Sequence, residues 1–170
     1  MNKIVKGKTK ETITKAVKIF GVSYNLDITY KYIKVPKLDV EDKIIKIVLP
    51  NKYKKINNNT ILEILIDKMY EAIAEKELDN IMEKVRLTLK FAPEDYEIAR
   101  IDKTLGKCLA DKIIINPDIV MYRKETIEYI IFHEFCHLKC KRHSKKFYDM
   151  IKSYMPNYEY CAYEVAGMQY

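Results

Sequence analysis

The three histidines of this 170-residue chain all fall within eleven residues. Two of them flank a glutamate in the run His133-Glu134-Phe135-Cys136-His137, an H-E-x-x-H pattern. On a helix, residues i and i+4 are separated by about 40° and about 6 Å, so both imidazoles can reach one metal ion. Glu134 lies beside them and can reach a metal-bound water without binding the metal. The pattern predicts a hydrolytic zinc site, because imidazole suits zinc and zinc has no redox chemistry.

A catalytic zinc needs a third protein ligand and one open position. In a continuous helix His143 would lie about 15 Å beyond His133, too far to share an ion. We therefore predict that the helix ends between Leu138 and Arg142, that the chain turns back, and that Ser144 caps the next helix. The predicted metal ligands are His133, His137 and His143. Cys140, or a distant Asp or Glu, is the alternative third ligand, although Cys140 lies about 10.5 Å along the helix axis from His133.

Such a site predicts hydrolysis of peptide bonds. Zinc lowers the pKa of its bound water toward about 7. Glu134 is then the general base that accepts the water proton, and the general acid that delivers it to the leaving amine. Tyr154 and Tyr158 are candidates for stabilising the oxyanion, and Asp149 and Glu159 are candidates for orienting the histidines.

The elements that must position these residues follow from hydrophobic periodicity and from turn and capping residues. We predict five helices, over 9–20, from Thr60 through Val85, over 124–139, from Ser144 through Ile151, and over 159–165. The second of these has a possible break near Leu78. We predict strands over 22–35, 43–49, 96–101 and 107–115. This order predicts an α+β fold, with a small mixed or antiparallel sheet on a central active-site helix and a helical C-terminal third. We expect one domain over 1–170, with an N-terminal part (1–95) and a catalytic core (96–170).

Composition excludes several classes of protein. Hydrophobic residues make up 48% of the chain and charged residues 32%, which excludes a disordered chain. No run approaches the roughly 18 apolar residues of a membrane span, and no secretory signal is evident. Four cysteines are too few for a disulfide framework in this length. We expect a cytoplasmic protein.

The C-terminal half resembles the YgjP-like metallopeptidase family. The resemblance rests on H-E-x-x-H-L, a third His six residues after the second, an immediate Ser, Phe147 and Met155-Pro156-Asn157-Tyr158. Upstream, Gly106-Lys107-Cys108 and the strand that ends in Asn116 are also similar. The family resemblance implies a zincin-like core in which His133, His137 and His143 hold zinc and Glu134 is the catalytic acid/base. It also implies that an extended peptide adds along the strand near 106–115.

The chain departs from that family pattern in two places. Leu105 stands where an aromatic residue usually precedes the glycine, and Tyr148 stands where a tryptophan is expected. The metzincin proteases place their third His at the same distance, but their turn contains a glycine where this chain has Cys140. The YgjP-like resemblance is therefore preferred.

A net charge of +7 raises the question of an anionic partner. Five basic residues surround the third histidine: Lys139, Lys141, Arg142, Lys145 and Lys146. We expect a peptide or protein substrate, and this charge can steer an anionic one. A metal-dependent nucleotide pyrophosphatase is the first alternative. A basic binding module with a structural zinc, completed by Cys140 or Cys108, is the second; no nucleic-acid recognition motif supports it.

Overall fold

A computed structural model describes residues 17–55 and 59–166, and within them it confirms the predicted α+β class. The chain divides into two compact units, residues 1–18 with 22–65, and residues 19–21 with 66–170. The expectation of one domain over 1–170 stays a prediction. No helix in the described ranges is long and apolar enough to cross a membrane.

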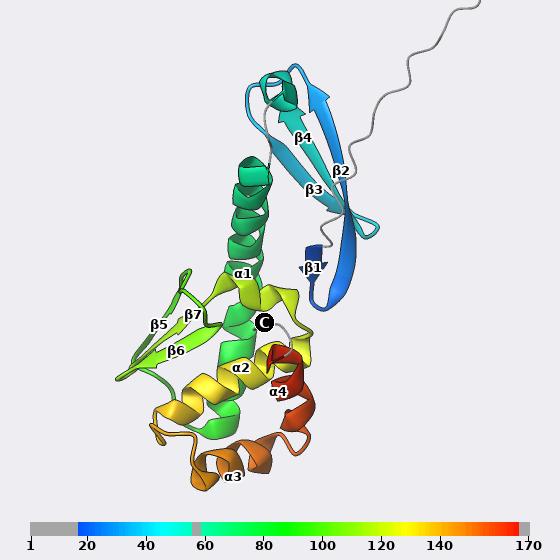
Figure 1. Ribbon diagram of the computed structural model, residues 1–170. Coiled ribbons are helices and arrows are strands. Elements are labelled where there is room, and N and C mark those ends of the chain that lie inside the picture. Colours follow the sequence, from blue (N-terminus) through cyan, green and yellow to red (C-terminus); the bar gives the residue numbers. More distant parts are fainter. Residues whose placement is uncertain (1–16, 56–58, 167–170) are drawn as a thin grey trace, which may run out of the picture. The chain divides into compact units, whose positions relative to one another are not determined.

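The first unit is built on a four-stranded sheet in the order β1-β2-β4-β3 (Figure 1). Its strands are β1 (Val17–Ile19), β2 (Val22–Lys31), β3 (Lys37–Glu41) and β4 (Ile44–Pro50). β4 runs parallel to β2 and antiparallel to β3, so the sheet is mixed. Ile45, Ile47 and Leu49 are fully buried, as the period-two alternation of a strand requires. A short 3-10 helix, η1 (Asn51–Lys55), follows.

The predicted helix over 9–20 is wrong at its C-terminal end. Residues 17–19 form β1, with Val17 and Ile19 buried, and residues 9–16 lie outside the described ranges. The chain turns at Phe20 and Gly21, which both have positive φ. Their backbone N–H groups bond to the carbonyls of Val120 and Met121, so tertiary contacts override the local helical pattern.

The long helix α1 (Asn59–Leu89) is continuous, and the possible break near Leu78 does not occur. Leu78 is fully buried within a stripe of buried residues spaced three or four apart: Tyr70, Ala74, Leu78, Met82, Val85 and Leu89. Because this stripe packs along one face, nothing favours a break in it.

The second unit contains a three-stranded mixed sheet in the order β5-β7-β6. β5 (Asp95–Ile98) is parallel to β7 (Lys112–Ile115), and β6 (Gly106–Leu109) is antiparallel to β7. The prediction of one strand over 107–115 is wrong, because the chain reverses at Ala110 and Asp111. Ala110 has φ 52 in a turn that lacks the usual glycine or asparagine.

Helices form the remainder of this unit, as predicted for the C-terminal third. Asn116 caps η2 (Pro117–Met121), and then come α2 (Lys124–His137), α3 (Lys145–Tyr154) and α4 (Tyr158–Ala166). Nine of the fourteen residues of α2 are buried, as expected for a central helix. It lies between β6 on one side and α3 and α4 on the other (Figure 1).

Candidate metal centre and active site

Two histidines project from the last turns of α2. His133 and His137 are one helical turn apart, and their Nε2 atoms lie 3.3 Å from each other. This agrees with the i, i+4 argument from the sequence.

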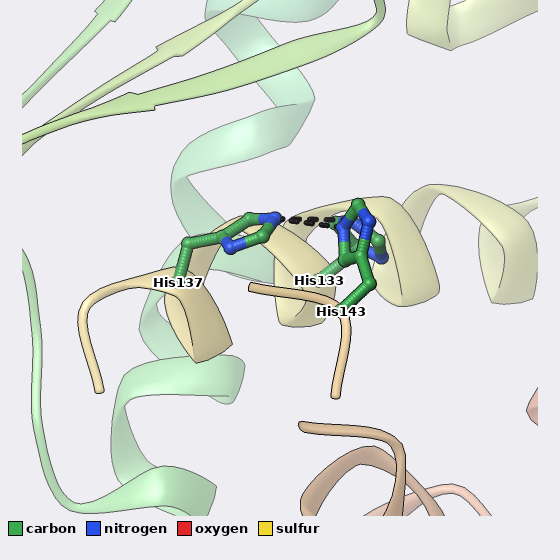
Figure 2. Close-up of side chains that lie close together, drawn as sticks. All are labelled: His133, His137 and His143. Carbon is green, nitrogen blue, oxygen red and sulfur yellow. Dashed lines mark hydrogen bonds between the residues drawn. The ribbon is translucent and has the colours of Figure 1, made fainter. Parts of the chain in front are cut away.

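The third histidine reaches the same point from outside the helix. α2 ends at His137 with Leu138 as its C-cap, and Ser144 caps α3 by accepting a hydrogen bond from the backbone N–H of Phe147. The predicted break and cap are therefore confirmed. His143 Nε2 lies 2.8 Å from that of His133 and 3.0 Å from that of His137, and Figure 2 shows the three rings converging.

These three nitrogens form a donor set that fits a metal ion. Nitrogens about 2.0–2.1 Å from a tetrahedral zinc lie about 3.3 Å apart, close to the spacing found here. Burial, together with His137 and His143, lowers the pKa of His133 to about 3, and burial also lowers the pKa of His137. Three Nε2 atoms this close cannot all satisfy one another, because each carries either one proton or one lone pair and at least two of them are therefore alike. A metal cation bound between the three rings would accept the lone pairs of all three Nε2 atoms. Within the described ranges, the cluster of potential metal ligands consists of these histidines, without Cys140.

Two contacts that sequence reasoning missed orient the rings. His137 Nδ1 lies 3.1 Å from the carbonyl oxygen of Cys140, which leaves Nε2 facing the cluster. Phe147 is fully buried, and its ring lies 4.7–4.9 Å, centroid to centroid, from all three imidazoles. Cys140 contacts the site through its backbone carbonyl, so the chemistry of its side chain could not have predicted this contact.

The candidates Asp149 and Glu159 do not take this orienting role. Glu159 pairs instead with Lys152, at 3.5 Å, and the described contacts of the three histidines include neither carboxylate.

Glu134 lies beside the histidines and is 8% exposed. Burial raises the pKa of its carboxyl to about 7, although the backbone N–H of Cys108 donates a hydrogen bond to it. Gly106 gives the side chain its space: a Cβ at this position would lie 2.6 Å from Glu134 Cγ. The G-x-C run therefore contacts Glu134 through its glycine and its cysteine N–H.

These residues open onto a cavity of about 520 Å³. One wall is Thr104 to Cys108, which includes the start of β6, and another is the face of α2 that carries Tyr129, His133 and His137. Ala162, Val165 and Ala166 of α4 form a third wall, and Lys141 and His143 close one end. The volume lies within the range of small-molecule and cofactor sites.

Among the described residues, the tyrosine that lines this cavity is Tyr129, and neither Tyr154 nor Tyr158 does so. Tyr154 stacks on Phe132, and Tyr158 stacks on Tyr129. Tyr129 is 6% exposed, burial raises its pKa to about 12, and its hydroxyl has no hydrogen-bond partner among the residues that the structure describes. Its position four residues before His133 on the same helix could have predicted that it lies beside that histidine.

The sequence and the structure were compared with those of known proteins. The model of the YgjP-like family, described as its metallopeptidase domain, matches residues 4–165. No curated protein matches the sequence. Among solved structures, the metallopeptidase zymogen of Pyrococcus abyssi, abylysin, is similar at 18% identity over 54% of this chain and 94% of that chain, with a TM-score of 0.47. The family match spans nearly the whole sequence, and the chain therefore belongs to the YgjP-like family of metallopeptidases.

Proposed function

We propose that this metallopeptidase is zinc-dependent, with His133, His137 and His143 as its metal ligands and Glu134 as its general base and acid. The observation that carries the proposal is the convergence of three Nε2 atoms within 3.3 Å, next to a buried carboxyl group. Three neutral nitrogen ligands leave one tetrahedral position for the reaction.

When bound at the three histidines, zinc supplies Lewis-acid chemistry to water and to the scissile carbonyl. Glu134 accepts the proton of the attacking water on a carboxylate oxygen and then donates it to the leaving amine. A pKa of about 7 suits both steps, because the group can hold or release a proton near neutral pH. Gly106 and the Cys108 N–H hold the carboxylate in place.

The peptide substrate lies along β6. Within the described ranges this strand pairs with β7 on one side, and its other edge has no strand partner. An extended peptide adds to such an edge through main-chain hydrogen bonds. Because the cavity runs along β6 past Glu134, this placement puts a peptide bond at the histidines.

Tyr129 is the hydrogen-bond donor to the substrate in this proposal, in place of Tyr154 and Tyr158. A buried hydroxyl without a partner is costly, and a substrate oxygen in the cavity removes that cost. A raised pKa keeps the phenol protonated, as a donor requires.

The test uses zinc-loaded protein and a mixture of unmodified peptides, with products identified by mass spectrometry. We expect about one zinc per chain, and in Glu134→Gln the same zinc content with at least a 10³-fold loss of cleavage. Glu128→Gln is the matched control: Glu128 lies on the same helix, pairs with Lys84, and is outside the cavity.

Full cleavage activity in Glu134→Gln would overturn the proposal. Release of pyrophosphate from nucleoside triphosphates without peptide cleavage, lost in the same variant, would assign a nucleotide hydrolase instead.

A further inference from the structure

The cavity differs in chemistry from one end to the other. Its two ends are defined along the axis of α2, on which Ile130 and His137 are about 10.5 Å apart with His133 and Glu134 between them. β6 runs alongside: Gly106 lies opposite Glu134, and Ala110, just after the strand, accepts a hydrogen bond from Lys141 Nζ at 3.3 Å.

One end is apolar. Leu105, Ile130, Ala162, Val165 and Ala166 line it, and none of these side chains has a hydrogen-bonding group. The hydroxyl-bearing side chains of Thr104 and Tyr129, their neighbours in the chain, also line the cavity. α4 is held here by Glu164, which pairs with Arg123 at 3.1 Å and bonds to Thr126 at the start of α2. This wall is therefore fixed to the N-terminal part of α2.

The other end is basic, although Asp111 lies near enough to act electrostatically on the same Cys108 thiol as Lys141. Lys141 lines the cavity there, and Lys139, Arg142, Lys145 and Lys146 surround it in the chain. In the described part of the chain none of these five forms an ion pair with a carboxylate, whereas Lys84, Lys112, Lys124 and Lys152 each do. Glu134 is the single carboxylate among the described lining residues, and it lies beside the histidines rather than at Lys141.

We propose that this polarity selects the substrate: the peptide places an apolar side chain against Leu105, Ile130 and Val165, and an acidic side chain at Lys141, on opposite sides of the cleaved bond. This inference rests on the proposed peptidase function and adds the class of peptide. Apolar contact contributes affinity at one end. An unpaired cation at the rim of a concave site attracts a carboxylate at the other.

The experiment uses a peptide library randomised at three positions on each side of the cleaved bond, with zinc-loaded protein and products read by mass spectrometry. We expect Asp and Glu to be enriched on one side of the bond and Leu, Ile, Val and Phe on the other. In single peptides, Glu→Gln at the acidic position lowers kcat/KM about fivefold, and less at high salt.

Two variants separate the two ends. Lys141→Glu replaces the preference for acidic residues with one for Lys and Arg, and leaves the apolar preference intact. Val165→Ser reduces the apolar preference at least about threefold and leaves the charge preference intact. Lys76→Glu, on the exposed surface of α1, is a control with the same charge change outside the cavity.

A second readout does not depend on catalysis. Fluorescence anisotropy of a labelled peptide with the apolar and acidic residues measures binding to the zinc-free protein. Lys141→Glu weakens this binding about fivefold, and Lys76→Glu does not.

Cleavage without a charge preference, or an unchanged preference in Lys141→Glu, would overturn the inference and leave the peptidase function standing. Absence of any cleavage that depends on zinc and Glu134 would overturn both.

Discussion

The two units of the chain differ in what they bury. In the first unit, the buried residues of the described part are all apolar, among them Ile45, Ile47 and Leu49. Its charged side chains lie at the surface, as in the exposed pair of Lys46 and Glu41. Among its described residues, the second unit buries three polar or charged side chains besides tyrosines, those of Asn116, Thr126 and Glu134.

Those three buried groups are satisfied to different degrees. The amide of Asn116 bonds to the carbonyls of Ile101 and Thr104 and to the N–H of Asp118, so it holds loops together. Thr126 bonds to Glu164. Glu134 receives one backbone N–H and faces a cavity. Buried polarity therefore marks both support and chemistry, and of these three groups Glu134 is the one that lines the cavity.

The largest expected effect is at the metal ligands. His137→Ala removes one of three converging nitrogens, so we expect zinc affinity to fall more than about 100-fold and hydrolysis to be lost. Zinc competition with a chromogenic chelator measures this. Cys140→Ser is the control, because it keeps the backbone carbonyl that faces His137 Nδ1. Equal zinc loss in Cys140→Ser would point to a thiolate ligand.

The next effect is at the glycine opposite Glu134. Gly106→Ala places a methyl group 2.6 Å from Glu134 Cγ, so the carboxylate must move. We expect kcat to fall about 100-fold, the cost of a displacement of about 1 Å, with zinc content unchanged. Leu109→Ala, at an exposed position of the same strand, is the control. Unaltered kcat in Gly106→Ala would mean that the position of Glu134 is not critical.

A stability measurement tests the burial of Glu134 without zinc. Its folded-state pKa is raised from 4.5 to about 7, so deprotonation opposes folding, and stability falls as pH rises between these values. In metal-free protein, Glu134→Gln should therefore gain about 2 kcal/mol relative to wild type between pH 5 and pH 8. Urea unfolding at both pH values checks this. A constant difference would show that the carboxyl is not held in a buried, protonated form.

A smaller effect is expected at Tyr129. Tyr129→Phe keeps the ring that stacks on Tyr158 and removes the unpartnered hydroxyl. We expect kcat to fall about tenfold with KM and zinc content little changed, because the hydrogen bond forms chiefly in the transition state. Tyr154→Phe, whose ring lies outside the cavity, should leave kcat unchanged. An equal loss in both variants would remove Tyr129 from the site.

The smallest effect is in the first unit. Glu41→Gln breaks an exposed ion pair with Lys46, and such pairs contribute little. Neither the thermal midpoint nor peptide cleavage should change measurably. Reduced cleavage would show that the first unit takes part in the reaction.

Features that depend on residues close together in sequence could be predicted, and contacts between residues that meet through tertiary packing could not. The helical spacing of His133 and His137, the helix end at Leu138 and the cap at Ser144 are local properties of the chain, and all were predicted correctly. The turn at Ala110 and Asp111 has no glycine, asparagine or proline and was missed. Phe147 beneath the histidines and Gly106 opposite Glu134 depend on tertiary contacts, which have no periodic signal.

The central proposal is that three imidazoles hold one zinc and leave a position open. X-ray absorption at the zinc edge on the zinc-loaded protein tests it most directly. The account predicts three imidazole nitrogens at about 2.0–2.1 Å, one further oxygen, and no sulfur. A sulfur at about 2.3 Å, from Cys140 or Cys108, or a fourth protein ligand, would contradict it.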